Sequence, residues 1–389
     1  MISGSGAAID MVRLLYPEPW TVSAGRSVRV RRDERRSYLL VPNATEPRLL
    51  VPAGPRRVVA ATVRRQLPGR HPSARMKRLA LGGLAASGVA AGWPSRLDVR
   101  CAAGGDSVER WLEQKLDVVG CRLAIRLGRP RANRKPVLHV MDEQGVVHAY
   151  VKVGHNPLSA SLVAAEAEAL EHLAGVRLRR VRVPNLLAHG MWNGLRLLAL
   201  EPLPVTGADV SADTVRAAAR EISLSDETRT LRWVGSDFRQ RLVDGIVAAG
   251  PRVATLRDTV SQLDDADPVV EFGAWHGDFN PGNFAAGHNE LLVWDWERYE
   301  RDVPMGFDLL HWAVQREITV LGVKPEEAGR TLLDQAGAVL NTSAMRGSWL
   351  ARMYLAWLAC RYVRDGQDEA GARLGHVERW LLPALAETR

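Results

Sequence analysis

The chain has 389 residues, and its 52 basic and 44 acidic side chains give it a net charge of +8. This length predicts two or three packed units, and a content of 46% hydrophobic residues excludes a disordered or fibrous protein. The three cysteines stand far apart without a CxxC pair, which excludes a disulfide scaffold and a cysteine zinc site and fits a reducing cytoplasm. The longest apolar run, residues 79–93, is too short to cross a bilayer, so we expect a cytoplasmic protein with no membrane partner.

Positive charge is concentrated in the first hundred residues, which carry 18 basic and 6 acidic side chains. Such a surface can bind nucleic acid or another anionic partner. However, no aromatic residues interleave with these arginines, and no nucleic-acid motif is present. We therefore favour an ordinary arginine-rich surface, in a chain that uses 47 Arg and only five Lys, over a nucleic-acid partner.

Residues 1–104 are predicted to form a small basic accessory domain of mixed α and β structure. The sequence pattern indicates strands at 27–32, 37–41 and 49–51 and helices at 56–66 and 74–86. Turn-forming residues at 92–94 and 102–106 mark the end of this domain.

Residues 105–203 are predicted to form a β-rich lobe, and residues 204–389 a mainly helical lobe. In the first lobe we expect strands at 122–127, 136–141, 146–153 and twice within 186–203, with a helix at 160–174. In the second lobe, short strands between residues 271 and 297 interrupt the helices. This order predicts a bilobal α+β protein with a cleft between the lobes.

The strongest chemical signal is the segment WHGDFNPGN, residues 275–283, directly after an apolar strand. Phosphoryl transfer needs a carboxylate that orients the attacking hydroxyl and accepts its proton. It also needs oxygen ligands for the Mg²⁺ that neutralises the nucleotide phosphates. Asp278 suits the first task and Asn283 the second. Taken alone, each also fits a structural role, because Asp and Asn favour turns and His276 could be a buried core histidine.

A second carboxylate strengthens the chemical interpretation. Two short strands, 284–286 and 290–294, are joined by residues 287–289. Folding this hairpin about residue 289 would bring Asn283 opposite Asp295. Bulky apolar residues surround Asp295, where a carboxylate needs a metal or a hydrogen-bond partner. The pattern therefore predicts that Asn283 and Asp295 bind one metal ion.

The β-rich lobe contributes a lysine and a glutamate. Lys152 lies in the apolar strand pattern YVKV, and Glu166 falls on the buried stripe of the following helix, in line with Leu162, Leu170 and Leu173. A buried carboxylate must be paired, so we predict a Lys152–Glu166 ion pair. A partly exposed Glu166 at the edge of the stripe is the alternative.

In this order and context, these residues resemble those of the protein-kinase-like phosphotransferases, in the branch of aminoglycoside phosphotransferases and choline kinases. That branch has HGD, here residues 276–278, where protein kinases have HRD, and a segment like Asp295-Trp296-Glu297 where they have DFG. Val183-Pro184, the segment LEPL at 200–203 and Asp308 match as well. The resemblance covers roughly residues 106–389.

The resemblance implies a bilobal protein-kinase-like α+β fold. It also implies a transfer of the γ-phosphate of ATP or GTP, dependent on Mg²⁺, to a hydroxyl of a small molecule. Asp278 would be the catalytic base, with His276 and Asp308 bracing its loop. Asn283 and Asp295 would bind the Mg²⁺.

The resemblance also assigns the nucleotide contacts. Lys152 would contact the α- and β-phosphates, and Glu166 would hold it in place. The backbone at 200–203, including Glu201 and Leu203, would receive the base of the nucleotide.

The sequence departs from the kinase pattern at the loop expected to cover the phosphates, residues 127–136, which has no GxGxxG. Side chains such as Asn133 and Arg134, with Arg129, Arg131 and Lys135, could bind the phosphates instead. A solvated basic turn is an equal alternative.

The acceptor stays open at this point. Glu297, Glu300 and Asp302 could attract a cationic acceptor such as an aminoglycoside, although a solvated acidic loop explains them equally well. A nucleoside antibiotic, a sugar and an amino alcohol are the other candidates, and self-association stays open. The alternative function is a catalytically idle kinase-like module whose basic domain contacts nucleic acid or a partner protein.

Overall fold

The computed structural model describes residues 4–25, 34–66, 95–102, 104–128, 131–371 and 373–386. The strand expected at 27–32 and the helix expected at 74–86 lie outside these residues. The chain divides into two compact units. The sheet unit comprises residues 1–129, 134–163 and 186–202, and the helical unit comprises residues 130–133, 164–185 and 203–389.

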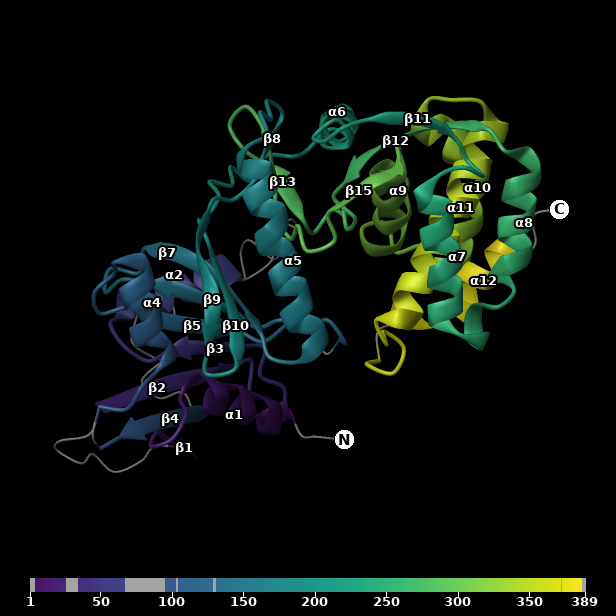
Figure 1. The fold of residues 1–389 in the computed structure, drawn as a ribbon. Helices are drawn as coiled ribbons and strands as arrows, with labels where there is room; N and C mark the ends of the chain where they lie inside the picture. The colour runs from purple at the N-terminus through teal and green to yellow at the C-terminus, as the bar shows by residue number, and fades with distance from the viewer. Residues whose placement is uncertain are drawn as a thin grey trace. The chain divides into compact units, whose positions relative to one another are not determined.

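The sheet unit is built on one antiparallel sheet. Within the described residues it has nine strands, in the order β1-β4-β2-β3-β5-β6-β7-β10-β9 (Figure 1). The strands are β1 (Thr21–Ala24), β2 (Glu34–Val41), β3 (Leu49–Pro52), β4 (Arg96–Cys101), β5 (Arg122–Arg126), β6 (Val137–Met141), β7 (Val147–Gly154), β9 (Leu186–Trp192) and β10 (Leu195–Leu200).

Helices cover both faces of this sheet. Each covered face has its own core, and the buried side chains of the strands alternate between the two cores. One core combines Leu40 and Leu50 of the sheet with apolar residues of α1 (Gly4–Leu15) and α4 (Val108–Leu116). The other combines Leu39 and Val51 with residues of α2 (Arg56–Gln66). A strand buried on both faces supplies apolar residues to both cores, as β3 does.

The strands from the first 104 residues continue directly into those that follow. Leu49 and Leu50 of β3 pair with Arg126 and Ile125 of β5. A buried polar cluster links the same two parts of the chain. In it, Glu109 of α4 accepts hydrogen bonds from the Tyr16 hydroxyl at 3.0 Å and from Arg36 Nε at 2.6 Å. The division of the chain at residue 104 stays a prediction.

The helical unit packs its helices around α11 (Ala344–Arg364), which contacts α7, α8, α9, α10 and α12 (Figure 1). Tyr354 and Leu358 of α11 are fully buried in its core. The other helices are α6 (Ala212–Ser223), α7 (Asp237–Ala249), α8 (Leu256–Ala266), α9 (Phe307–Thr319), α10 (Pro325–Leu340) and α12 (Val377–Ala386).

Two small sheets complete the described part of the helical unit. They follow the orders β11-β12-β15 and β13-β14-β8. Their strands are β8 (Val181–Arg182), β11 (Arg229–Arg232), β12 (Val269–Trp275), β13 (Phe284–Ala286), β14 (Leu291–Val293) and β15 (Glu300–Pro304). The helix α5 (Pro157–Ala174) crosses from one unit to the other between Val163 and Ala164. The predicted α+β class, with a β-rich first unit and a mainly helical second unit, is confirmed.

Candidate active site

The loop between β12 and β13 is fixed to the helix α9 through its backbone. The amides of His276 and Gly277 donate to the carboxylate of Asp308, at 2.8 and 3.1 Å. Gly277 has φ +82°, and a Cβ at this position would lie 2.1 Å from the carbonyl oxygen of Arg298. Only glycine therefore fits the second position of the HGD motif.

His276 is fully buried, and both of its ring nitrogens have backbone partners. Nε2 lies 3.1 Å from the carbonyl oxygen of Trp294, and Nδ1 accepts the amide of Asp278 at 3.2 Å. One nitrogen donates and the other accepts, which is the pattern of neutral imidazole. Burial lowers the pKa of His276 to about 4, so the ring is neutral at pH 7. The ring connects the Asp278 loop to the residue before Asp295.

Three side chains donate hydrogen bonds to the carboxylate of Asp278. They are Asn280 Nδ2 at 3.0 Å, Asn283 Nδ2 at 2.9 Å and His311 Nε2 at 2.9 Å. Burial alone would raise the pKa of Asp278, but the hydrogen bond from His311 and the charges of His311 and Arg361 outweigh it and hold the pKa well below its usual range. The side chain is 35% exposed, so this ionised acceptor can also be reached from outside.

His311 was not predicted from the sequence. It is fully buried on α9, and its Nδ1 lies 2.8 Å from the hydroxyl of Tyr354 on α11. The signal was its spacing from Asp308, because residues three apart share one face of a helix. Both side chains therefore reach the catalytic loop from one turn of α9.

The register of the β13–β14 hairpin corrects one prediction. Phe284 pairs with Val293, and the amide of Trp294 donates to the carbonyl of Asn283 at 3.0 Å. Asn283 thus lies opposite Trp294, not Asp295. The reason is the turn, which has four residues and is closed by the Gly287 amide on the Glu290 carbonyl at 2.9 Å.

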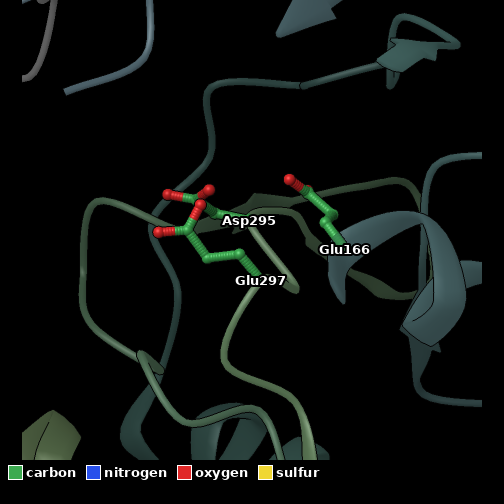
Figure 2. Close-up of side chains that lie close together, drawn as sticks. All are labelled: Glu166, Asp295 and Glu297. Atoms are coloured by element: carbon green, nitrogen blue, oxygen red, sulfur yellow. The ribbon is translucent and has the colours of Figure 1, made fainter. Parts of the chain in front are cut away.

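Asp295 instead lies close to two glutamates. One carboxylate oxygen from each of Glu166, Asp295 and Glu297 lies within 4.8 Å of the others. Figure 2 shows Asp295 and Glu297 side by side, with Glu166 extending toward them from α5. The amide of Trp296 donates to Glu166 at 3.2 Å. Asp295 has φ +74°, a left-handed conformation that Asp tolerates better than most residues.

The burial of this carboxylate cluster decides between two sequence interpretations. Glu166 is fully buried, as its position on the helix stripe predicts. Glu297 is only 5% exposed, so the solvated acidic loop suggested as an alternative is wrong for this residue. Three close carboxylates repel one another unless a cation or protons compensate their charge. Carboxylate oxygens are the ligands that Mg²⁺ and Ca²⁺ prefer, so the cluster fits a hard divalent cation.

The predicted nucleotide contacts are spread over both units. Lys152 lies on β7, paired with Val137 and Leu198 in the sheet unit. Glu166 belongs to the helical unit, and the Lys152–Glu166 pair stays a prediction.

The predicted phosphate loop and hinge also lie where the chain passes between units. Asn133 belongs to the helical unit and Arg134 to the sheet unit, where its Nε donates to the carbonyl of Leu127 at 2.6 Å. Arg129 is outside the described residues. The segment expected as the hinge crosses between units directly before Leu203, with Glu201 on the sheet side. These nucleotide roles stay predictions.

Comparison with known proteins yields similarity to solved structures only. No protein-family model matches the sequence, and no curated protein matches it. The chain is similar to aminoglycoside phosphotransferase APH(4)-Ia, a thermostable mutant solved with ADP and hygromycin B, at 14% identity and a TM-score of 0.47, covering 73% of this chain and 99% of that one. It is also similar to aminoglycoside 2'-phosphotransferase-IIIa with GDP, at 12% identity and a TM-score of 0.43, covering 72% and 96%.

A third similar structure is the amicoumacin kinase hAmiN with AMP-PNP, Ca²⁺ and Ami, at 12% identity and a TM-score of 0.39, covering 65% of this chain and 86% of that one. Within the described part of the chain, no helix is both long enough and apolar enough to span a bilayer.

Proposed function

We propose that the protein transfers the γ-phosphate of ATP or GTP to a hydroxyl group of a small molecule. The environment of Asp278 supports this most: its carboxylate is ionised, partly exposed and held by three side-chain donors. His276 links its loop to the segment that carries the Asp295 cluster. A proton acceptor and a cluster suited to a cation are the two elements that phosphoryl transfer requires.

In the proposed reaction, Asp278 accepts a hydrogen bond from the acceptor hydroxyl and orients its oxygen toward the γ-phosphorus. A bond forms between this oxygen and phosphorus, while the bond from phosphorus to the β–γ bridging oxygen breaks. The hydroxyl proton passes to Asp278 and then to water, and the nucleoside diphosphate leaves. Because its pKa is low, Asp278 serves mainly to orient the hydroxyl, which suits a loose transition state with late proton transfer.

Glu166, Asp295 and Glu297 would hold the divalent cation, together with Asn283 as predicted from the sequence. Bound there, Mg²⁺ would neutralise charge on the nucleotide phosphates. The amide nitrogen of Asn283 donates to Asp278, which leaves its amide oxygen as the atom suited to a cation. Asn283 would then couple the base to the metal.

The nucleotide contacts are proposed as the family resemblance assigns them. Lys152 would neutralise the α- and β-phosphates, with Asn133 and Arg134 contributing from the phosphate loop. The backbone at Glu201 and Leu203 would receive the base. In this proposal Glu166 has a cation-binding role as well as its predicted role beside Lys152.

The test is nucleotide-dependent product formation. ADP or GDP release is measured over sugars, aminoglycosides, nucleoside antibiotics and amino alcohols with Mg²⁺, and mass spectrometry identifies the phosphate adduct. We expect Asp278→Asn to lower kcat by about a hundred- to ten-thousandfold, because the amide cannot accept the proton. Asp334→Asn, an exposed carboxylate on α10, is the matched control. Unchanged turnover in Asp278→Asn, with an unchanged circular dichroism spectrum, would contradict the mechanism.

A further inference from the structure

A cavity of about 510 Å³ in the helical unit adjoins both parts of the candidate active site. Glu297 lines it, and the same side chain belongs to the carboxylate cluster. Arg361 lines it too, and its Nη1 donates to the carbonyl of Gly277 at 2.6 Å, directly before Asp278. A molecule in this cavity would therefore contact Glu297 of the proposed cation site and Arg361, which binds the backbone directly before Asp278.

Four arginines line the cavity, and two of them have carboxylate partners. Arg298 forms an ion pair with Asp365, and Arg241 Nε lies 3.3 Å from Glu300. These ion pairs neutralise part of the charge on the cavity wall. Their guanidinium groups are therefore already engaged by the protein.

The other two arginines, Arg361 and Arg364, lie three residues apart on α11 and reach the same cavity. Neither has a carboxylate within ion-pair distance among the described residues. The guanidinium carbon of Arg361 also lies 5.9 Å from the centroid of the Trp275 ring. Three acidic residues also line the cavity. Glu297 belongs to the carboxylate cluster, and Glu300 forms an ion pair with Arg241. Asp244 is exposed and accepts a hydrogen bond from Gln240 at 2.8 Å.

We propose that this cavity binds the acceptor, and that the acceptor carries an anionic group, such as a carboxylate, on the same molecule as the reacting hydroxyl. This inference rests on the proposed function. The forked guanidinium groups of Arg361 and Arg364 match a carboxylate, which they can bind through paired hydrogen bonds. Trp357, which is half-buried, lines the same cavity and offers an apolar ring to the carbon skeleton.

The same charges disfavour a polycationic acceptor. An ammonium group placed against Arg361 and Arg364 would lie next to two guanidinium groups, and like charges repel. The structure thus separates the acceptor candidates that the sequence leaves open. An anionic sugar or hydroxy acid is favoured over an aminoglycoside.

The test compares acceptors that differ in one group. D-glucuronate, D-glucose and D-glucosamine share a ring and carry a carboxylate, an alcohol and an ammonium group; D-glycerate, glycerol and serinol form a shorter series. We expect the carboxylate member of a series to have the highest kcat/KM. Arg364→Gln should raise its KM by about ten- to hundredfold, with the KM for nucleotide unchanged. Arg346→Gln, an exposed arginine of α11 outside the cavity, should change neither value.

Binding supplies a readout that does not depend on turnover. We expect the carboxylate members to raise the Tm of the parent protein and not that of Arg364→Gln. Preference for the ammonium members, or equal responses of parent and Arg364→Gln to every anion, would overturn the inference while leaving phosphoryl transfer intact. If anion binding depends on Arg364 but no hydroxyl compound is phosphorylated, the anion site stands and the proposed function fails.

Discussion

At the scale of single residues, a series of hydrogen bonds runs from Tyr354 through His311 to Asp278 and helps to keep this proposed base ionised. The Tyr354 hydroxyl lies on Nδ1 of His311, and Nε2 of the same ring lies on Asp278. Because an ionised carboxylate can only accept, Nε2 of His311 carries the donated proton, and the tyrosine hydroxyl adapts to Nδ1. Burial lowers the pKa of His311, while the hydrogen bond and the charge of Asp278 act in the opposite direction.

Removing this donor should weaken catalysis through Asp278. We expect His311→Leu to lower kcat about ten- to hundredfold, since hydrogen bonds to charged groups contribute about 1.5–3 kcal/mol. It should also raise the pKa of Asp278 and move the acid limb of the kcat profile to higher pH. His311→Gln, which can still donate, should restore part of both effects. An unshifted pH profile in His311→Leu would leave His311 with a packing role only.

His276 should make stability depend on pH. The unfolded chain binds a proton near pH 6.5, whereas the buried ring binds one only near pH 4. Between these values the unfolded state carries more protons, so the contribution of His276 to stability falls as the pH decreases from 6.5 to 4 and is constant below. Relative to His276→Asn, the parent should lose up to about 3 kcal/mol of unfolding free energy over this range.

This measurement must compare the two proteins in urea at each pH. Burial raises the pKa of Asp308 to about 7, and its contribution changes in the opposite direction over the same range. The variant retains Asp308, so the difference between the two curves isolates His276. A difference that does not vary with pH would show that His276 titrates alike in both states.

At the scale of elements, the hairpin β13–β14 and the helix α5 bring the carboxylate cluster together. Neighbours in sequence supply Asp295 and Glu297, and a helix more than a hundred residues earlier supplies Glu166. The Trp296 amide donates a hydrogen bond to Glu166, and this bond connects α5 to the segment that carries Asp295 and Glu297.

The cluster makes Glu297 a test of cation binding. We expect Glu297→Gln to raise the Mg²⁺ concentration needed for half-maximal activity by about tenfold, since it removes one charged ligand. Fluorescence titration with Mn²⁺ should show the same loss without any turnover. The control is Glu271→Gln, an exposed carboxylate of β12. Equal cation affinity in the two variants would exclude Glu297 as a ligand.

The sequence predicted most elements around the site, because their periodicity is local. The helix at 56–66, the β6–β7 hairpin, the burial of Glu166 and the position of the Asp278 loop all follow from pattern and turn residues. The hairpin register did not, since a four-residue turn and a three-residue turn look alike in sequence and differ by one position in pairing. His311 and the burial of Glu297 depend on packing between distant segments, which no local pattern records.

At the scale of the whole molecule, the first 104 residues supply strands β1 to β4 of the described sheet. Leu50 is fully buried beside β5, and burial of such a side chain contributes about 1.5–3 kcal/mol. The basic accessory domain predicted from charge thus shares its sheet and its core with the residues that follow.

Deleting residues 1–104 should therefore expose the edge of β5 and the buried carboxylate of Glu109. We expect the shortened chain to aggregate or to lose its cooperative unfolding transition, measured by sedimentation and by thermal circular dichroism. Leu50→Ala in the full chain should cost about 2–5 kcal/mol, by the same loss of packing. A soluble, active chain of residues 105–389 would show that residues 1–104 are dispensable.

The place of β3 in the sheet also bears on synthesis of the chain. Leu50 pairs with Ile125, so one edge of β3 has no strand partner until a much later segment leaves the ribosome. At about 5–20 residues per second, this interval lasts several seconds. During that time an apolar strand with unpaired backbone groups can pair with other nascent chains, which is a route to aggregation.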